Sequence, residues 1–571
     1  MEQKPLAWIN QTIGSKRIYL VFLTLVQSLN SASGVFYAVI LKELVDSAAK
    51  GDADGFWRYV LYGVLLVAFQ ITIRAVNRWL MELSRASFEN AFKARQLDAL
   101  LGRDLSQVSG VHSAEWLNRL TNDTVVVSQG LVDILPGVAS MVVKLISALA
   151  MMAALEPRFT VILIPLGLVL IVVSWLFRKV LKRYHKSVQE ADGRLRVFLQ
   201  ERISSLLVIH SYGAEGYVKG QAAERMEEHK KERMRRNHFS NLPNIGFAVI
   251  MNGLSLFAAC WCGYGILKGT MSFGTLTAVT QLVAQIQMPF ANISGFVPRY
   301  YSMIASAERL MEAERFEEDL GDRAAEEPGA FYDSLAAIGL ENVSYSYADR
   351  ADGAGSEAAV KDLSLEVQKG SWVAFTGHSG CGKTTALKLL MCILKPQSGL
   401  RYYKLKAAGK QDTVDSLRTE CNTPSEKLPL DSKWRSLFAY VPQGNQLMNG
   451  TIREVVSLAD PTAASDDARI TRALDLACAS EFVSQLEDGA DTLLGERGCG
   501  LSEGQMQRIA IARALFSERP IILLDEATAS LDAATERRVL ENIKALPGKT
   551  VIIVTHRSAA LDYCEQVINF E

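Results

Sequence analysis

Apolar residues are distributed differently in the two parts of the chain. Up to about Ile304 the sequence contains long apolar runs, whereas beyond about Glu312 short apolar runs alternate with polar segments, as in a soluble α/β domain. A transmembrane helix needs about 20 residues, and six stretches reach that length. They lie near 18–41, 57–81, 131–154, 159–181, 244–268 and 273–303. The pattern predicts a multidomain membrane protein with a six-helix α transmembrane domain at 1–315, a linker at 316–334 and an α/β domain at 335–571.

The connections between these stretches differ in charge. Segments 83–130 and 178–236 are rich in Lys and Arg, whereas 43–56 carries four carboxylates. Basic loops stay in the cytoplasm, so we expect a cell-membrane protein with both termini, the two long loops and the α/β domain on the cytoplasmic side. Both long loops have the composition of helical hairpins. Their tips, near 106–116 and 211–215, are expected to dock on the α/β domain.

Charge and cysteine content exclude some function classes. The 61 basic and 62 acidic residues give a net charge of −1, which offers no bulk attraction for nucleic acid. The eight cysteines form no metal-ligand array, and we expect free thiols. No cleavable signal pattern is found in Met1–Lys16, before the first span.

A glycine-rich turn carries the first chemical signal. Residues 377–384 read Gly-His-Ser-Gly-Cys-Gly-Lys-Thr, between an apolar strand-like run at 371–376 and a predicted helix at 384–392. In such a loop the backbone N–H groups point at one phosphate, the lysine adds a cation and the Thr hydroxyl serves Mg²⁺. The turn therefore predicts binding of a nucleoside triphosphate. The expected contacts are Gly377, Ser379, Gly380, Cys381, Gly382, Lys383, Thr384 and Thr385.

Two further apolar runs, at 520–524 and 550–555, end in polar residues. Asp525 follows the first run, in the usual position of a carboxylate that holds Mg²⁺ through water. Glu526 comes next and can orient or deprotonate the attacking water. His556 follows the second run, where an imidazole can contact the γ-phosphate; a purely structural histidine is the alternative.

A further motif, Leu501-Ser-Glu-Gly-Gln505, lies between the glycine-rich turn and the run at 520–524. Together with the six spans, these motifs resemble an exporter-type half-transporter of the ATP-binding cassette (ABC) superfamily. The resemblance covers essentially the whole chain. It implies that Tyr347 stacks on adenine, with Tyr345 as a rival, and that Gln443 links Mg²⁺ to the membrane domain. It also implies that Asp532 contacts the opposite subunit. Ser502, Gly504 and Gln505 would belong to the nucleotide site of the partner. The family's coupling helices fall near Val108–Trp116 and Ser211–Gly216.

The resemblance also implies the activity. The chain would be an ATP-driven exporter subunit that moves an amphiphilic small molecule, lipid or peptide out of the cytoplasm. It would use ATP and Mg²⁺ and work with a second, identical or related half-transporter. Thr384, Gln443 and Asp525 would serve the metal, and the catalytic residues would be Glu526, His556, Lys383 and Gln443. An importer with the same fold and a non-transporting regulatory membrane ATPase remain as alternatives.

The chain departs from the family pattern in four places. Glu503 replaces the commonest glycine of the signature, and it would either weaken closure or point to solvent. The loop 348–359 is longer than usual, and segment 399–435 is expected to be long and irregular. The usual last strand and helix are expected to be missing after His556. Lys144, inside a span, would contact substrate, pair with a neighbour or reach the membrane surface. Candidate cavity residues are Gln27, Asn30, Lys144, Gln281, Gln285, Asn292 and Arg299.

Overall fold

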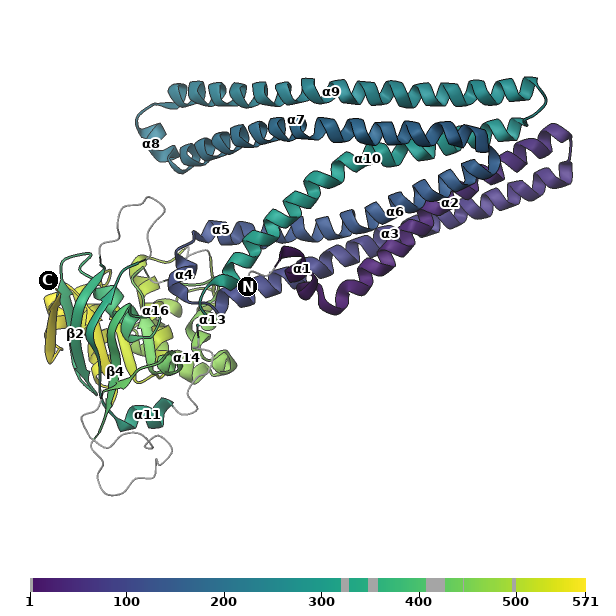
Figure 1. Ribbon diagram of the computed structural model, residues 1–571. Helices are drawn as coiled ribbons and strands as arrows, with labels where there is room; N and C mark the ends of the chain where they lie inside the picture. The colour runs from purple at the N-terminus through teal and green to yellow at the C-terminus, as the bar shows by residue number, and fades with distance from the viewer. Residues whose placement is uncertain are drawn as a thin grey trace. The chain divides into compact units, whose positions relative to one another are not determined.

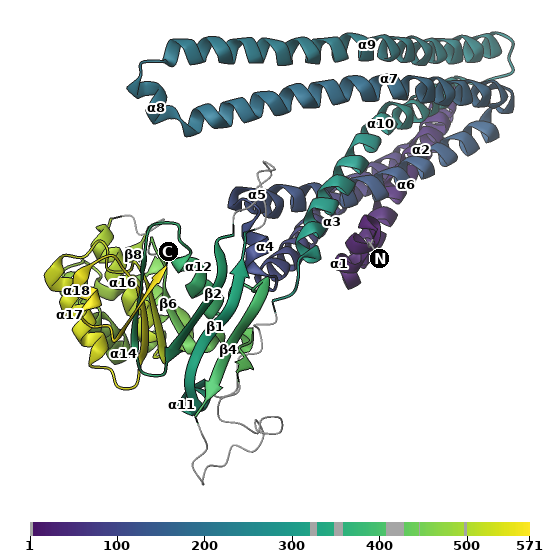
Figure 2. The same cartoon turned by 60° about the vertical axis from the view of Figure 1, so that its left-hand side comes forward.

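The computed structural model describes residues 4–319, 328–347, 358–406, 427–444, 446–495 and 500–570. The chain forms two compact units, shown in Figures 1 and 2. The first consists of Met1–Arg95 and Arg119–Leu310, and the second of Gln96–Asn118 and Met311–Glu571. The expected loop 348–359, the middle of the linker, and Cys421 and Cys499 lie wholly or mostly outside the described residues.

Long helices build the first unit (Figure 1). They are α2 (Arg17–Lys50), α3 (Ala53–Leu101), α6 (Thr124–Leu155), α7 (Pro157–Ser204), α9 (Glu215–Leu267) and α10 (Phe273–Glu312). Within the described residues, four helical segments are long and apolar enough to cross a membrane: Pro5–Lys50, Ala53–Leu101, Ser113–Leu155 and Ala248–Leu267. The expected spans at 159–181 and 273–303 lie in α7 and α10 and stay predictions, because many of their side chains are outside the described part.

Small residues let these helices approach closely. A Cβ atom on Gly130 would lie 2.8 Å from Met303, and one on Gly274 would lie 2.2 Å from the carbonyl oxygen of Lys42. Close backbone contact of this kind is typical of membrane helices, whose association depends on packing. The buried cluster between α2, α6, α9 and α10 includes Val35, Ala38, Ala148, Met152, Leu254, Ala258, Leu282 and Val283.

The residues before the first span form a helix that the sequence analysis did not predict. This helix, α1 (Pro5–Ile13), buries Trp8 to 1% exposure. The indole stacks on Phe92 of α3 at 5.6 Å between ring centroids, and the Arg95 guanidinium lies 4.8 Å from the indole ring. The short helix is therefore fixed to α3 by aromatic and cation–π contacts.

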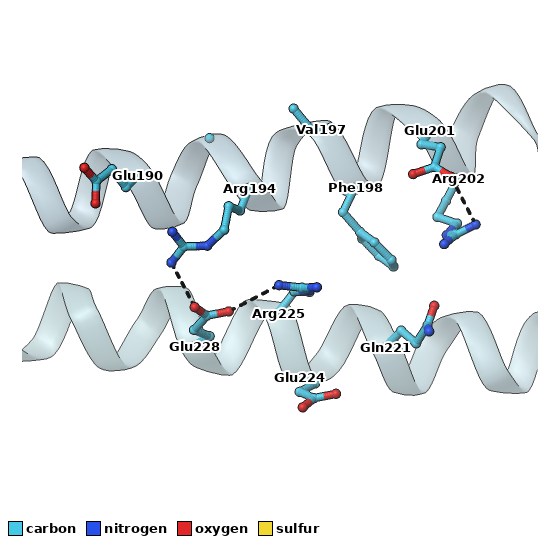
Figure 3. A pocket seen from close by; sticks show the side chains of 11 residues that line it. Glu190, Arg194, Val197, Phe198, Glu201, Arg202, Gln221, Glu224, Arg225 and Glu228 are labelled. Atoms are coloured by element: carbon cyan, nitrogen blue, oxygen red, sulfur yellow. Dashed lines mark hydrogen bonds and ion pairs between the residues drawn. The ribbon is translucent and has the colours of Figure 1, made fainter. Parts of the chain in front are cut away.

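The helices α7 and α9 run side by side and are joined at one end by α8 (Leu206–Ser211), as Figures 1 and 2 show. A groove of about 850 Å³ lies between them (Figure 3). Glu228 of α9 bridges two arginines there, at 2.9 Å from Arg194 of α7 and 3.6 Å from Arg225. The facing helices are thus held together by charge as well as by packing.

Two sheets form the core of the second unit. The parallel sheet has the order β11-β3-β10-β9-β6, from β3 (Trp372–Gly377), β6 (Phe438–Val441), β9 (Ile521–Asp525), β10 (Thr550–Val554) and β11 (Gln566–Phe570). Successive residues of β9 pack into opposite cores: Ile522 lies in one cluster, and Ile521 in the other. This arrangement confirms the α/β class, because the apolar runs are strands covered on both faces. The expectation that the last strand is missing after His556 is wrong, because β11 follows His556 and pairs in parallel with β3.

An antiparallel sheet of order β2-β1-β4-β5 accompanies it, from β1 (Leu335–Tyr345), β2 (Val360–Gln368), β4 (Ser398–Leu405) and β5 (Leu428–Pro429). Tyr402 pairs with Pro429 and Tyr403 with Leu428. The expectation of irregular structure across 399–435 is therefore wrong at both ends of that segment. The antiparallel ladder brings the ends together, and only residues 407–426 lie outside the described part.

The first of the two expected tips, near 106–116, belongs to the second unit. It contains α4 (Leu105–Ser109) and α5 (Ser113–Asn118), and it is tied to the segment after α10 by backbone bonds. The Asp104 N–H donates to the Glu317 carbonyl at 2.9 Å, and the Asp319 N–H donates to the Gly102 carbonyl at 3.0 Å. Ser106 also lies close to the side chain of Tyr345, at the end of β1. The tip thus contacts the segment after α10 and lies near the end of β1.

Candidate functional site

The turn between β3 and α12 (Lys383–Leu390) requires glycine at two positions. Gly377 and Gly382 have φ angles of 136° and 97°, which side chains rarely adopt. A Cβ on Gly377 would lie 2.2 Å from the Phe570 carbonyl oxygen, and one on Gly382 would lie 2.4 Å from the Ala359 carbonyl oxygen. The loop therefore leaves its backbone N–H groups close to the N-terminus of α12, where an anion is favoured.

Lys383 is held inside this loop. Its side chain is 5% exposed, and Nζ donates to the carbonyl oxygens of Gly377 at 2.8 Å and His378 at 2.9 Å. The sulfur of Cys381 lies 3.6 Å from the same nitrogen. The ammonium group thus lies within the backbone turn that runs from Gly377 through Ser379, Gly380 and Gly382. Backbone carbonyl groups of the loop thus hold the cation at the N-terminus of α12.

Asp525 ends β9 and is fully buried. Its Oδ1 accepts a hydrogen bond from Thr384 Oγ1 at 3.0 Å, and Oδ2 accepts one from the Tyr440 hydroxyl at 3.0 Å. Burial raises the pKa of the Asp525 carboxyl, and the two hydrogen bonds oppose that rise. Burial and the neighbouring carboxylate also raise the pKa of Tyr440, so the phenol keeps its proton and donates.

Tyr440 is a site residue that the sequence analysis missed. It lies on β6, which pairs in parallel with β9, and its register partner is Leu523, two residues before Asp525. Its only sequence signal is its position three residues before Gln443. That signal gains meaning only once the two strands are known to be neighbours.

Glu526 and Gln443 are brought together beside Asp525. The Gln443 Nε2 donates to Glu526 Oε2 at 2.9 Å. Glu526 has a φ angle of 50°, and its N–H donates to the Val554 carbonyl at 3.1 Å. A left-handed backbone at a non-glycine residue is strained and occurs often at functional sites. His556 follows β10 and is exposed.

Of the two candidate aromatic residues, Tyr347 is the accessible one. Its side chain is 43% exposed, and its hydroxyl lies 3.3 Å from Thr385 Oγ1, next to the phosphate loop. Tyr345 is 4% exposed and packs edge-to-face against Tyr347, at 5.1 Å between ring centroids. Only the Tyr347 ring has a surface available for a stacking partner.

The signature residues form a second group at the start of α16 (Glu503–Phe516). Ser502 and Gln505 make a reciprocal capping box: the Ser502 N–H donates to Gln505 Oε1 at 2.8 Å, and the Gln505 N–H donates to Ser502 Oγ at 3.3 Å. Glu503 is exposed in the first helical turn, where a carboxylate suits the helix dipole. A Cβ on Gly504 would lie 2.9 Å from the Ser530 carbonyl oxygen.

The close approach at Gly504 connects the signature to Asp532. The Ser530 N–H donates to Gln507 Oε1 at 3.0 Å, which fixes this segment on α16. Asp532 then caps α17 (Ala533–Lys544) and accepts from the N–H groups of Ala534 at 3.1 Å and Thr535 at 3.0 Å. These hydrogen bonds lower the pKa of Asp532. The expected site residues therefore fall into a phosphate-loop group and a signature group.

Two known protein families match this chain. The model of the ABC transporter transmembrane region matches residues 17–290, and the ABC transporter model matches residues 360–529. The chain belongs to the ABC transporter family. Both modules occur in one chain, so this ABC transporter is a fused half-transporter of the exporter type, and its nucleotide-binding domain couples ATP hydrolysis to transport. It is an integral membrane protein.

Several relatives cover nearly the whole ABC transporter chain. An ATP-dependent lipid A-core flippase of Mannheimia succiniciproducens is 26% identical over 98% of this chain and 91% of its own length. A multidrug resistance ABC transporter of Lactococcus lactis is 26% identical, over 93% and 85%. The structure of a bacterial Atm1-family ABC exporter with ATP bound has a TM-score of 0.75 and 22% identity, over 98% and 94%. That structure shows the shared fold.

Proposed function

We propose that this ABC exporter moves an amphiphilic small molecule, lipid or peptide out of the cytoplasm, driven by ATP held between its own cassette and that of a second half-transporter. The observations that carry the proposal are two side-chain hydrogen bonds, from Thr384 to Asp525 and from Gln443 to the adjacent Glu526. Next to Thr384 in the chain, Lys383 is held by the Gly377 carbonyl of the phosphate loop. The residues form a phosphate cradle, an oxygen pair suited to a hard cation and a carboxylate for water.

Each group of the ATP site has a role in this proposal. Gly377, Gly380, Gly382 and Lys383 would bind the β- and γ-phosphates, and the Tyr347 ring would stack on adenine. The hydroxyl and carboxylate oxygens of Thr384 and Asp525, with Gln443, are the hard ligands that Mg²⁺ prefers. The bound ion would neutralise phosphate charge. Glu526, oriented by Gln443, would accept a proton from the attacking water, and His556 would contact the γ-phosphate.

Exposed surfaces support a second chain in the working unit. Ser502 and Glu503, at the start of the signature helix, are exposed. At the second cytoplasmic tip, Leu207 is 84% and Tyr212 83% exposed. Apolar side chains grouped at one helical tip favour docking on another protein surface. An identical or related half-transporter would cover the tip and complete each ATP site with its own Ser502, Gly504, Gln505 and Asp532, or their equivalents.

The substrate class is supported by two relatives whose names specify lipid A-core flipping and multidrug resistance. Both activities concern amphiphilic or lipophilic molecules. The excess of basic residues in segment 178–236 and the Lys and Arg residues of segment 83–130 support a cytoplasmic position for the cassette and for both termini of a cell-membrane protein. The export direction is supported by the likeness of the fold to a bacterial Atm1-family ABC exporter.

Inverted membrane vesicles test this function. With the cassette outside, wild-type vesicles should accumulate a fluorescent amphiphile when ATP and Mg²⁺ are added, and vesicles with the Glu526→Gln variant should not. Loss of a preloaded amphiphile from the vesicles on ATP addition would indicate import instead. ATP hydrolysis without movement of any amphiphile in a broad panel would favour a regulatory ATPase.

A further inference from the structure

The contacts between α6 and α10 define an antiparallel stripe on each helix. Gly130 faces Met303, Asp133 pairs with Arg299 at 3.2 Å, and Gly137 faces Phe296. As the residue numbers on α6 increase by about one turn, those of the contacting residues on α10 decrease by about one turn. The same stripe of α6 continues through Lys144 to Ala148, which is fully buried in the helix core. Lys144 therefore lies on the side of α6 that faces α10, opposite the level of Pro289.

Lys144 is an uncompensated charge near the middle of its span. Asp133 is the only carboxylate within the six expected spans, and it pairs with Arg299. It precedes Lys144 by eleven positions, about 16 Å along the helix. Among the described residues, none forms a hydrogen bond or ion pair with Lys144. Two further cations, Arg74 and Arg78 on α3, are exposed. The spans thus carry more positive than negative charge away from their ends.

Hydrogen-bond acceptors lie at the same level of α10. Pro289 lacks an N–H group, so the carbonyl of Gln285, four residues earlier, loses its helical donor. The Gln285 Nε2 donates to the Gly34 carbonyl of α2 at 2.5 Å, but its buried Oε1 has no partner among the described residues. A cation on α6 and free acceptors on α10 therefore lie at adjacent levels of the helix interface.

We propose that Lys144 binds the anionic head group of the transported amphiphile, a phosphate or a carboxylate. This assignment rests on the proposed function and gives its substrate class a charge. A lysine inside the apolar part of a bilayer is costly unless an anion or water accompanies it, and the chain supplies no carboxylate within reach. The acceptors of Gln285 favour a head group that also carries a hydroxyl or amide N–H donor.

The test measures binding without nucleotide. Full-length protein in phosphatidylcholine nanodiscs is titrated with dodecyl phosphate, and the rise in unfolding temperature gives the half-saturating concentration. Dodecylphosphocholine has the same chain with a zwitterionic head, and inorganic phosphate has the same charge without a chain. We expect tight binding of dodecyl phosphate alone. The Lys144→Met variant should raise its half-saturating concentration tenfold or more, since a charge-assisted contact is lost.

Two variants serve as references. Lys144→Arg should restore binding to within about threefold, because it keeps the charge. Lys50→Met removes an exposed lysine at the end of α2, outside the span, and should bind like the wild type. Unchanged binding in Lys144→Met, or equal responses to dodecyl phosphate and dodecylphosphocholine, would overturn the assignment. A response to inorganic phosphate would overturn the amphiphile part of it. Because no ATP is present, these outcomes are distinct from failure of the vesicle transport experiment.

Discussion

Tyr440 donates its hydroxyl hydrogen to Asp525 Oδ2 at 3.0 Å, while Thr384 donates to Oδ1 of the same carboxylate. The bond joins two neighbouring strands, β6 and β9, at the edge where the phosphate loop lies. A buried carboxylate with both oxygens fixed has little freedom to rotate. Tyr440 therefore positions Asp525, although it belongs to none of the motifs that identify the site.

The Tyr440→Phe variant should weaken metal binding at the site without affecting nucleotide binding in EDTA. One neutral hydrogen bond contributes about 1 kcal/mol, or roughly fivefold in affinity. We expect the Mn²⁺ concentration that half-saturates the ATP-loaded protein, measured by electron paramagnetic resonance, to rise by about that factor. The loss of the hydroxyl also removes an interaction that opposes the raised pKa of Asp525. The acid limb of the ATPase pH profile should therefore move to higher pH. Identical Mn²⁺ titrations would show that Tyr440 is only a packing residue.

The Glu526→Gln variant should bind ATP normally and hydrolyse it at least 100-fold more slowly, because general-base catalysis contributes about that much or more. The amide keeps the shape of the side chain and its contact with Gln443. Trapped nucleotide after gel filtration and phosphate release together measure both properties. Glu565→Gln is a suitable control, since it removes a carboxylate only from the exposed Lys544 ion pair. Undiminished hydrolysis in Glu526→Gln would refute the assigned role.

Part of this site was predictable, and the reason is physical. A phosphate loop needs glycine where a Cβ would strike the backbone, and Gly377 and Gly382 meet that need within a short segment. Buried strands read as apolar runs, which located β3, β9 and β10. By contrast, Tyr440 lies 85 positions from Asp525, and their contact depends on strand order. Strand β11 was wrongly expected to be missing because Gln566 and Asn569 interrupt the continuous apolar run that marks β9 and β10.

Asp532 predicts a defined pH dependence of stability. Its pKa is lowered in the folded chain by the N–H groups that it accepts from. Its charge therefore adds stability above the pKa of an unfolded aspartate, about 4, and that contribution is lost as pH falls through the lower folded value. Asp532→Asn retains a capping side chain without the charge. The unfolding temperature of the wild type should exceed that of the variant at pH 7, and the difference should shrink below pH 4. A difference in unfolding temperature that does not change with pH would show that the charge of Asp532 does not cause it.

Arg435 predicts a coupling defect. Its guanidinium donates to both Asp319 oxygens, at 2.9 and 3.2 Å, and to the Cys392 carbonyl at 2.6 Å. The Asp319 N–H donates to the Gly102 carbonyl, beside α4, so this arginine joins the cassette to the segment after α10. Arg435→Met should leave nucleotide binding intact and reduce stimulation of ATPase activity by a transported amphiphile, by about twofold to fivefold for the loss of part of this network. The matched control is Lys395→Met, which removes only the exposed ion pair between Lys395 and the neighbouring Glu317. Equal stimulation in both variants would show that the contacts between Arg435 and Asp319 do not couple amphiphile binding to ATP hydrolysis.

The buried ion pair between Asp123 and Arg309 is expected to stabilise the helical unit. The carboxylate is fully buried and accepts from Ser306 Oγ at 2.9 Å and from Arg309 at 2.8 and 2.5 Å, where a π-helical turn at Arg119–Asp123 leads into α6. Removing one partner of a buried pair costs about 3–5 kcal/mol, but Arg309 is 46% exposed and can regain water. We therefore expect Asp123→Ala to lose about 1–3 kcal/mol, and Arg309→Met to lose more, because it leaves the buried carboxylate unpaired. A double-mutant cycle on unfolding in detergent would measure the coupling. If Arg309→Met were the milder change, the carboxylate would not depend on that arginine for its burial.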